Sequence, residues 1–156
     1  MSQVKKIPDG YRTVTPYLAV KNATAAIDFY QRVFDAKEVG RISMPDGTIG
    51  HAELKIGDSK IMLAEEMPAW GNKSPVSLSG TSVGIALYVE NADAVFNRAL
   101  DAGATSLEAM KNQFYGDRIG TLVDPFGHKW HVMTHIEDVT FADMQKRFDE
   151  LYAGQR

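Results

Sequence analysis

The chain repeats one order of apolar and polar positions. The stretch LAVKNA at 18–23 recurs as LYVENA at 87–92, an offset of 69 residues. Each copy reads as a short apolar strand followed by a run with helical spacing. In the first run Ile27, Tyr30 and Phe34 fall on one helix face, and in the second Val95 and Ala99 do so. Repetition at a fixed offset predicts two copies of one structural unit.

The stretches after each helix read as strands joined by tight turns. HAELKIGDSKIMLAEE has a Gly-Asp turn at 57–58 between two alternating runs. The same offset carries Lys60–Met62 onto Lys129–His131, and the turn onto the DPFG stretch at 124–127. We therefore predict an α+β fold of two βαβββ modules, at 12–66 and 82–136, within a single domain at 12–136. A Pro/Gly/Ser-rich linker at 67–81 joins the modules, and residues 1–11 form an N-terminal extension.

The C-terminal segment, 137–156, is predicted to add a helix that Thr140 caps. Its apolar positions form one stripe, made of Phe141, Met144, Phe148, Leu151 and Tyr152. Two interpretations stay open: the stripe covers part of its own domain, or it contacts a partner subunit.

Composition narrows the function classes. Of the 156 residues 44% are hydrophobic, which is enough for a sizeable core. A net charge of −3, without a Lys/Arg run, favours neither nucleic acid nor an anionic membrane as a partner. The absence of cysteine excludes disulfides, thiolate metal sites and cysteine nucleophiles. With no apolar run of membrane-spanning or signal-peptide length, a cytoplasmic location is expected.

Strand alternation predicts which side chains face away from the helices. The side chains expected on this open face, and therefore as ligand-binding candidates, are His51, Glu53, Met62, Arg118, His131 and Met133. The two-residue turn at 57–58 places Glu53 opposite Met62. Trp130 and Val132 are expected to face the helices, and His135 the open side.

Each candidate also has a structural interpretation. Glu53 and Arg118 pair with each other, or with Lys55, as readily as with a ligand. The two methionines fill gaps in apolar surroundings. A histidine near a strand end, as at His135, is more often a surface or satisfied residue than a ligand. Trp70 and Tyr115 lie in loops, where either rims the site or packs.

Two sequence stretches carry a family resemblance. LAVKNATAAIDFYQRVF and YGDRIGTLVDPFGHKWHVMTH, within the two modules, resemble the vicinal oxygen chelate superfamily, which includes glyoxalase I, bleomycin-resistance proteins and extradiol dioxygenases. HAELKIGDSKIMLAEEMP and SPVSLSG are most similar to its PhnB-like branch. The resemblance implies sheets that curl into cups, and a homodimer that sometimes exchanges modules.

The resemblance also locates the positions that ligate a divalent ion in metal-dependent members. They map to Thr15 and Met62 in the first module and to Gly84 and His131 in the second. Of these only His131 is a conventional ligand for such ions, and a catalytic ion usually needs about three protein ligands. A substitute site built from His51, Glu53 and His131 stays open.

The sequence therefore favours a binding protein without a metal or other cofactor, whose partner is a small polar or aromatic molecule in the sheet cup. The alternative is a metal-dependent lyase, isomerase, transferase or dioxygenase of the same superfamily.

Overall fold

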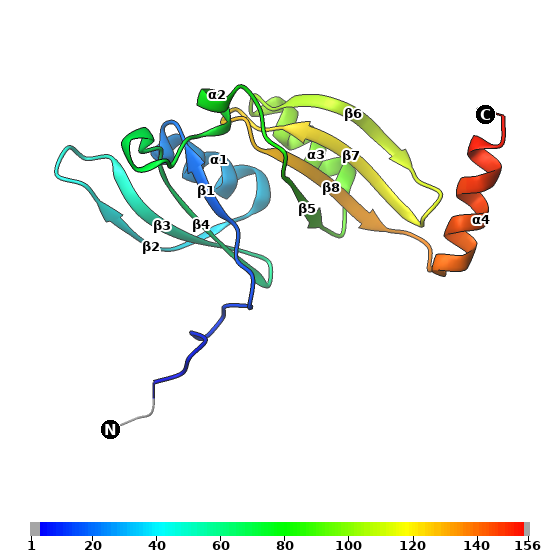
Figure 1. Ribbon diagram of the computed structural model, residues 1–156, viewed down its shortest axis with the longest axis horizontal. Coiled ribbons are helices and arrows are strands. Elements are labelled where there is room, and N and C mark those ends of the chain that lie inside the picture. Colours follow the sequence, from blue (N-terminus) through cyan, green and yellow to red (C-terminus); the bar gives the residue numbers. More distant parts are fainter. Residues whose placement is uncertain (1–3, 155–156) are drawn as a thin grey trace. The chain divides into compact units, whose positions relative to one another are not determined.

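A computed structural model describes residues 4–154 as two compact units. Among the described residues, the first unit comprises 4–82 and 125–127, and the second comprises 83–124 and 128–154. Each unit contains a four-stranded mixed sheet with a helix on one face, as Figure 1 shows. The predicted α+β fold of two βαβββ modules is confirmed.

The first sheet has the strand order β1-β4-β3-β2. Its elements are β1 (Tyr17–Val20), α1 (Ala23–Phe34), β2 (Lys37–Ser43), β3 (Ile49–Ile56) and β4 (Ser59–Glu65). β1 pairs parallel to β4, and the other pairs are antiparallel. The helix begins where the Asn22 side chain caps it, and both Glu65 carboxylate oxygens accept from the first backbone N–H groups.

The predicted helix face forms the core of the first unit. Ile27 and Tyr30 of α1 are fully buried, and Phe34 nearly so. Phe126, from the turn at 124–128, packs in the same unit with its ring centroid 6.0 Å from Phe29 and 6.2 Å from Tyr30.

The second sheet repeats the first in the order β5-β8-β7-β6. Its elements are β5 (Gly84–Tyr88), α3 (Ala92–Asp101), β6 (Thr105–Asn112), β7 (Asp117–Val123) and β8 (Lys129–His135). In the parallel pairs Tyr17 faces Met62 and Ala86 faces His131, so both strands of the pair follow the predicted offset. The internal repeat is therefore a structural one.

The linker contains two short helices, η1 (Pro68–Trp70) and α2 (Pro75–Leu78). Ser74 caps α2, with Pro75 in its first turn. The Glu66 carboxylate accepts from the Ser74 backbone N–H and the Ser77 hydroxyl. These hydrogen bonds lower the pKa of Glu66 to about 2, and the one from the Ser74 N–H has the largest effect.

α4 (Phe141–Tyr152) follows the second sheet, capped by Thr140. Arg147 donates to the Phe114 carbonyl and pairs with Glu137, and the Phe148 ring lies 5.7 Å from that of Phe114. No residue of this helix is buried, and Phe141 is 88% exposed. Within the chain the stripe is covered only in part. Among residues 4–154 no helix is long and apolar enough to cross a bilayer.

Candidate functional site

The first sheet has one apolar and one polar face, as alternation predicts. Ala52, Leu54 and Leu63 are fully buried on the face that α1 covers. Glu53 pairs with Met62, and both lie half-buried on the open face. The predicted register of this hairpin is confirmed, because a two-residue turn fixes which residues are opposite.

A hydrogen-bonded cluster lies on this open face. The Tyr17 hydroxyl is 2.9 Å from His51 Nδ1, and the two rings are 5.5 Å apart. His51 Nε2 lies 3.5 Å from Glu53 Oε1. β1 and β3 thus bring a phenol, an imidazole and a carboxylate together, with about a quarter of the His51 and Glu53 side chains exposed (28% and 27%).

Glu53 is an anion at neutral pH. The adjacent Tyr11 hydroxyl is the main cause of its lowered pKa, and His51 and Lys60 lower the pKa further. Tyr11 and Tyr17 were not among the sequence candidates. Tyr17 could have been predicted from the sequence. It is the first residue of an otherwise apolar strand, and the hydroxyl of a partly buried tyrosine usually has a hydrogen-bond partner.

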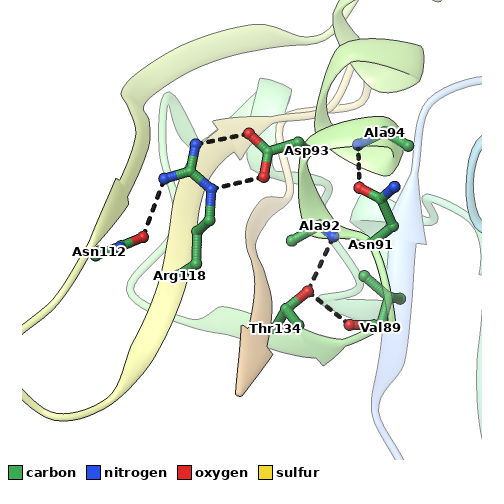
Figure 2. A network of polar contacts seen from close by, with 8 residues as sticks. All are labelled: Val89, Asn91, Ala92, Asp93, Ala94, Asn112, Arg118 and Thr134. Atoms are coloured by element: carbon green, nitrogen blue, oxygen red, sulfur yellow. Dashed lines mark hydrogen bonds and ion pairs between the residues drawn. The ribbon is translucent and has the colours of Figure 1, made fainter. Parts of the chain in front are cut away.

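Arg118 does not lie on the open face of the second sheet, so its predicted orientation is wrong. It pairs with Thr134, on the face that α3 covers. Its guanidinium forms a bidentate ion pair with Asp93 of α3 at 2.6 and 2.7 Å, and donates to Asn112 Oδ1 at 3.0 Å (Figure 2). Through these contacts Arg118, on β7, links α3 with β6.

The length of the second turn explains the error. Ile56 pairs with Ser59 across the even turn at 57–58, whereas Val123 pairs with Lys129 across the odd turn at 124–128. Changing a turn by one residue moves every side chain of the preceding strand to the other face. The offset of the repeat therefore holds for β8 but not for β7.

Figure 2 shows that the start of α3 is also tied to β8. Thr134 accepts from the Ala92 N–H at 2.9 Å and donates to the Val89 carbonyl at 2.7 Å. The Asn91 side chain caps the helix through the Ala94 N–H. Together with Arg118, these contacts fix the helix on the sheet.

Arg118→Met is expected to lower the melting temperature slightly and to leave ligand affinity unchanged, because Arg118 binds Asp93 and lies on the helix side. The pair is partly exposed, so the loss should shrink in high salt. Thermal unfolding at low and high salt tests the first part. A loss of ligand affinity in a variant that remains folded would restore Arg118 as a binding residue.

His131 and Met133 lie on the face of the second sheet away from α3, as predicted, and Trp130 and Val132 are buried on the other face. His131 is half-buried, whereas Met133 is only 7% exposed. His131 Nδ1 is 3.0 Å from the Thr121 hydroxyl. A Cβ on Gly84 would lie 2.5 Å from His131 Nε2. The imidazole therefore occupies the space that a side chain at position 84 would need.

A second polar network lies on this face, around Asp117, which the sequence candidates did not include. Asp117 is 5% exposed and accepts from the Tyr88 hydroxyl at 2.7 Å. His135 Nδ1 lies 2.8 Å from Asp117, and its Nε2 lies 2.9 Å from Asp138. His135 is thus satisfied by protein carboxylates, which agrees with its structural interpretation.

His135 should make stability depend on pH. Asp138 and then Asp117 raise its pKa above the ordinary 6.5, so the folded state favours the charged imidazole. Its contribution to stability is fully present below 6.5 and is lost as pH rises through the higher folded value. The wild type should therefore melt at a higher temperature than His135→Gln, and the difference should be largest at mildly acidic pH. An equal difference at every pH from about 5.5 to 9 would contradict this.

The side chains at the four positions that the resemblance maps to metal ligands do not form a conventional donor set. Thr15 and Met62 are poor ligands for zinc, nickel, manganese or iron, and Gly84 has no donor. Within residues 4–154, no group of three or more His, Cys, Asp or Glu side chains is arranged to hold an ion. His51 and Glu53 lie together in the first unit, and His131 belongs to the second.

The loop aromatics differ in exposure. Trp70, in η1, is 77% exposed. Tyr115 is half-buried, and its pKa is raised by burial and then by Asp117 and Glu108. Tyr115 therefore adjoins the Asp117 network.

The fold and sequence place the chain in a known family. Residues 12–132 match the Glyoxalase/Bleomycin resistance protein/Dioxygenase superfamily, and the chain belongs to it. It is 45% identical over 135 residues to the uncharacterized protein Mb0911c of Mycobacterium bovis, covering 85% of this chain and 89% of that protein.

Solved structures share the fold. The crystal structure of TioX from Micromonospora sp. ML1 is similar with a TM-score of 0.60 and 26% identity, covering 83% of this chain and 100% of TioX. A PhnB protein from Bacillus cereus, described as a putative 3-demethylubiquinone-9 3-methyltransferase, has a TM-score of 0.63 at 18% identity, covering 79% and 99% of the two chains. At that identity the likeness concerns the fold alone.

Proposed function

We propose that this chain binds a small polar or aromatic molecule on the open faces of its sheets, without a divalent ion as cofactor. The Tyr17–His51–Glu53 cluster carries the proposal. These groups are held in place by mutual contacts, remain partly exposed and surround Met62, a flexible apolar side chain. His131 and Met133 supply a polar and an apolar contact on the second sheet.

The chemistry of the family's metal positions supports the absence of an ion from this function. Three of the four positions lack a suitable donor, and the imidazole at the fourth lies against Gly84. In this proposal His51 and His131 exchange hydrogen bonds with the ligand, and Glu53 accepts them.

Metal content of untagged protein is the first test, followed by titration of zinc, nickel and manganese into the chelator-treated protein. We expect less than stoichiometric metal and no tight uptake. Stoichiometric binding that weakens in His131→Ala would favour a metal-dependent enzyme instead.

Ligand binding is tested by thermal shift with a panel of small aromatic acids, amines and alcohols. We expect at least one class to raise the melting temperature of the wild type, and less so in His51→Ala or Glu53→Gln. The matched control is Lys37→Gln, an exposed change on β2 away from the cluster. The proposal fails if no compound binds, or if His51→Ala and Glu53→Gln bind the compounds as well as the wild type does.

We also propose a homodimer, because the α4 stripe is poorly covered within the chain. Sedimentation should give twice the chain mass of 17.2 kDa. A monomeric mass at micromolar concentration would exclude it, and deletion of residues after Val139 tests whether α4 contributes.

A further inference from the structure

The N-terminal extension carries a turn that lies on the open face of the first sheet. We call residues 8–11 the N-terminal strap. The Tyr11 N–H donates to the Pro8 carbonyl at 3.2 Å, and Gly10 has a φ of 79°, which favours glycine. A Cβ on Gly10 would lie 3.2 Å from Lys60 Cε. The strap therefore packs closely on Lys60 of β4.

Tyr11 brings a buried hydroxyl close to the Glu53 carboxylate. Its hydroxyl is buried and has no hydrogen bond of ordinary geometry among the described residues, although it adjoins the Glu53 carboxylate. Burial, and then Glu53, raise the pKa of Tyr11 to about 12. The phenol therefore keeps its proton at neutral pH, and a buried donor of this kind favours a partner.

Lys60 places a cation against the same ring. Its ammonium lies 4.1 Å from the Tyr11 ring centroid and 3.4 Å from the Asp9 carbonyl oxygen. It lies two residues before Met62 on the same strand, so it shares the open face with Glu53. A carboxylate and an aromatic ring together suit a positive group, and Lys60 supplies one from within the chain.

We propose that the strap and the open face of the first sheet form a site for the protonated amino group of a small organic ligand. Glu53 is its counter-ion, the Tyr11 and Tyr17 rings flank it, and the ligand ammonium replaces that of Lys60. The inference rests on the proposed function and names the ligand class. An anionic ligand would instead meet repulsion from Glu53.

Lys60 can be replaced because a competing ammonium can take over its interactions with the Tyr11 ring and the Glu53 carboxylate. The hydrogen bond to Asp9 is long, and a lysine side chain has several rotatable bonds through which the ammonium can move into solvent. A ligand ammonium must therefore compete with Lys60, so removing the lysine charge should tighten cation binding. For an anionic ligand the same change should weaken it. The sign of the effect distinguishes the two.

The experiment titrates the full chain, followed by NMR at pH 7, with phenethylamine as the cation and 3-phenylpropionate as the matched anion. We expect phenethylamine to bind and to shift the signals of Tyr11 and His51. Glu53→Gln should weaken binding by about tenfold or more, as expected for the loss of one hydrogen bond to a charged group. Lys60→Met should strengthen it severalfold, and Tyr11→Ala should weaken it more than Tyr11→Phe.

Lys55→Met is the matched control. Lys55 is the direct partner of Lys60 across the hairpin, so this change removes the same charge from the same face without touching Tyr11. Equal tightening in both lysine variants would show a general effect of net charge and would overturn the replacement of Lys60.

The remaining outcomes separate the two proposals. If 3-phenylpropionate binds better than phenethylamine, and Lys60→Met weakens it, the amine inference fails while small-molecule binding stands. If the cation fails to bind while neutral aromatic alcohols bind with dependence on His51, the inference again fails alone. If neither probe nor any panel compound binds, both proposals fail.

Discussion

Alanine at Gly116 is expected to lower the free energy of unfolding by about 3 kcal/mol, as the sum of backbone strain and a steric clash. Gly116 has a φ of 96°, where a Cβ would run into the Glu137 carbonyl and lie 3.1 Å from Val139 Cγ2. The Gly116 carbonyl also accepts from the N–H groups of Ile136 and Glu137. The segment that leads into α4 therefore depends on this close approach.

Urea denaturation measures the effect, and hydrogen exchange shows where it arises. Amides of 136–139 and of α4 should lose protection before those of β7 and β8. Gly40→Ala is the control, because Gly40 lies on exposed β2 with nothing within 4 Å of an added Cβ and no positive φ. Equal stability of Gly116→Ala and Gly40→Ala would contradict the packing described here.

Local rules predicted the elements and the first hairpin correctly. Helix spacing placed Ile27 and Tyr30 in the core. A two-residue turn left only one register, so Glu53 had to face Met62. In this hairpin the Gly-Asp pair defines a two-residue turn, so strand alternation was enough to assign each side chain to a face of the sheet.

The second hairpin shows where such reasoning fails. Arg118 was assigned to the open face by strand alternation, but the odd number of residues in the turn at 124–128 puts it on the opposite face. Its partner, Asp93, is supplied by a helix 25 residues away, so the ion pair depends on tertiary packing. The alternation of residues along a strand does not show which helix residue will lie next to Arg118 in the folded chain.

The missed residues have the same cause. Tyr11 belongs to a segment without periodicity, so nothing in the sequence places it on β3 and β4. Asp117 was not among the sequence candidates, because its burial depends on the contacts that Tyr88 and His135 make with it. Long-range polar contacts thus define much of the candidate site, whereas local patterns define the scaffold.

Trp130→Ala is expected to cost about 3–5 kcal/mol, the range for removing a large buried aromatic. The side chain is 1% exposed, between strand partners Ile85 and Leu122. Its Nε1 donates to Asp124 Oδ2 at 2.8 Å. Truncation therefore leaves a cavity and removes a hydrogen bond from a buried carboxylate. Denaturant unfolding should show a lower midpoint with an unchanged slope.

Trp130→Phe separates the two contributions, because it keeps most of the volume and loses the indole N–H. We expect a smaller loss, about 1–3 kcal/mol, mainly from the buried Asp124 oxygen. The neighbouring His131 points to the opposite face and contacts Thr121, so its NMR signals and the ligand affinity should stay unchanged. A large shift of His131 in this variant would show that the two faces are coupled. The open face would then not be a surface that can be altered independently of the core.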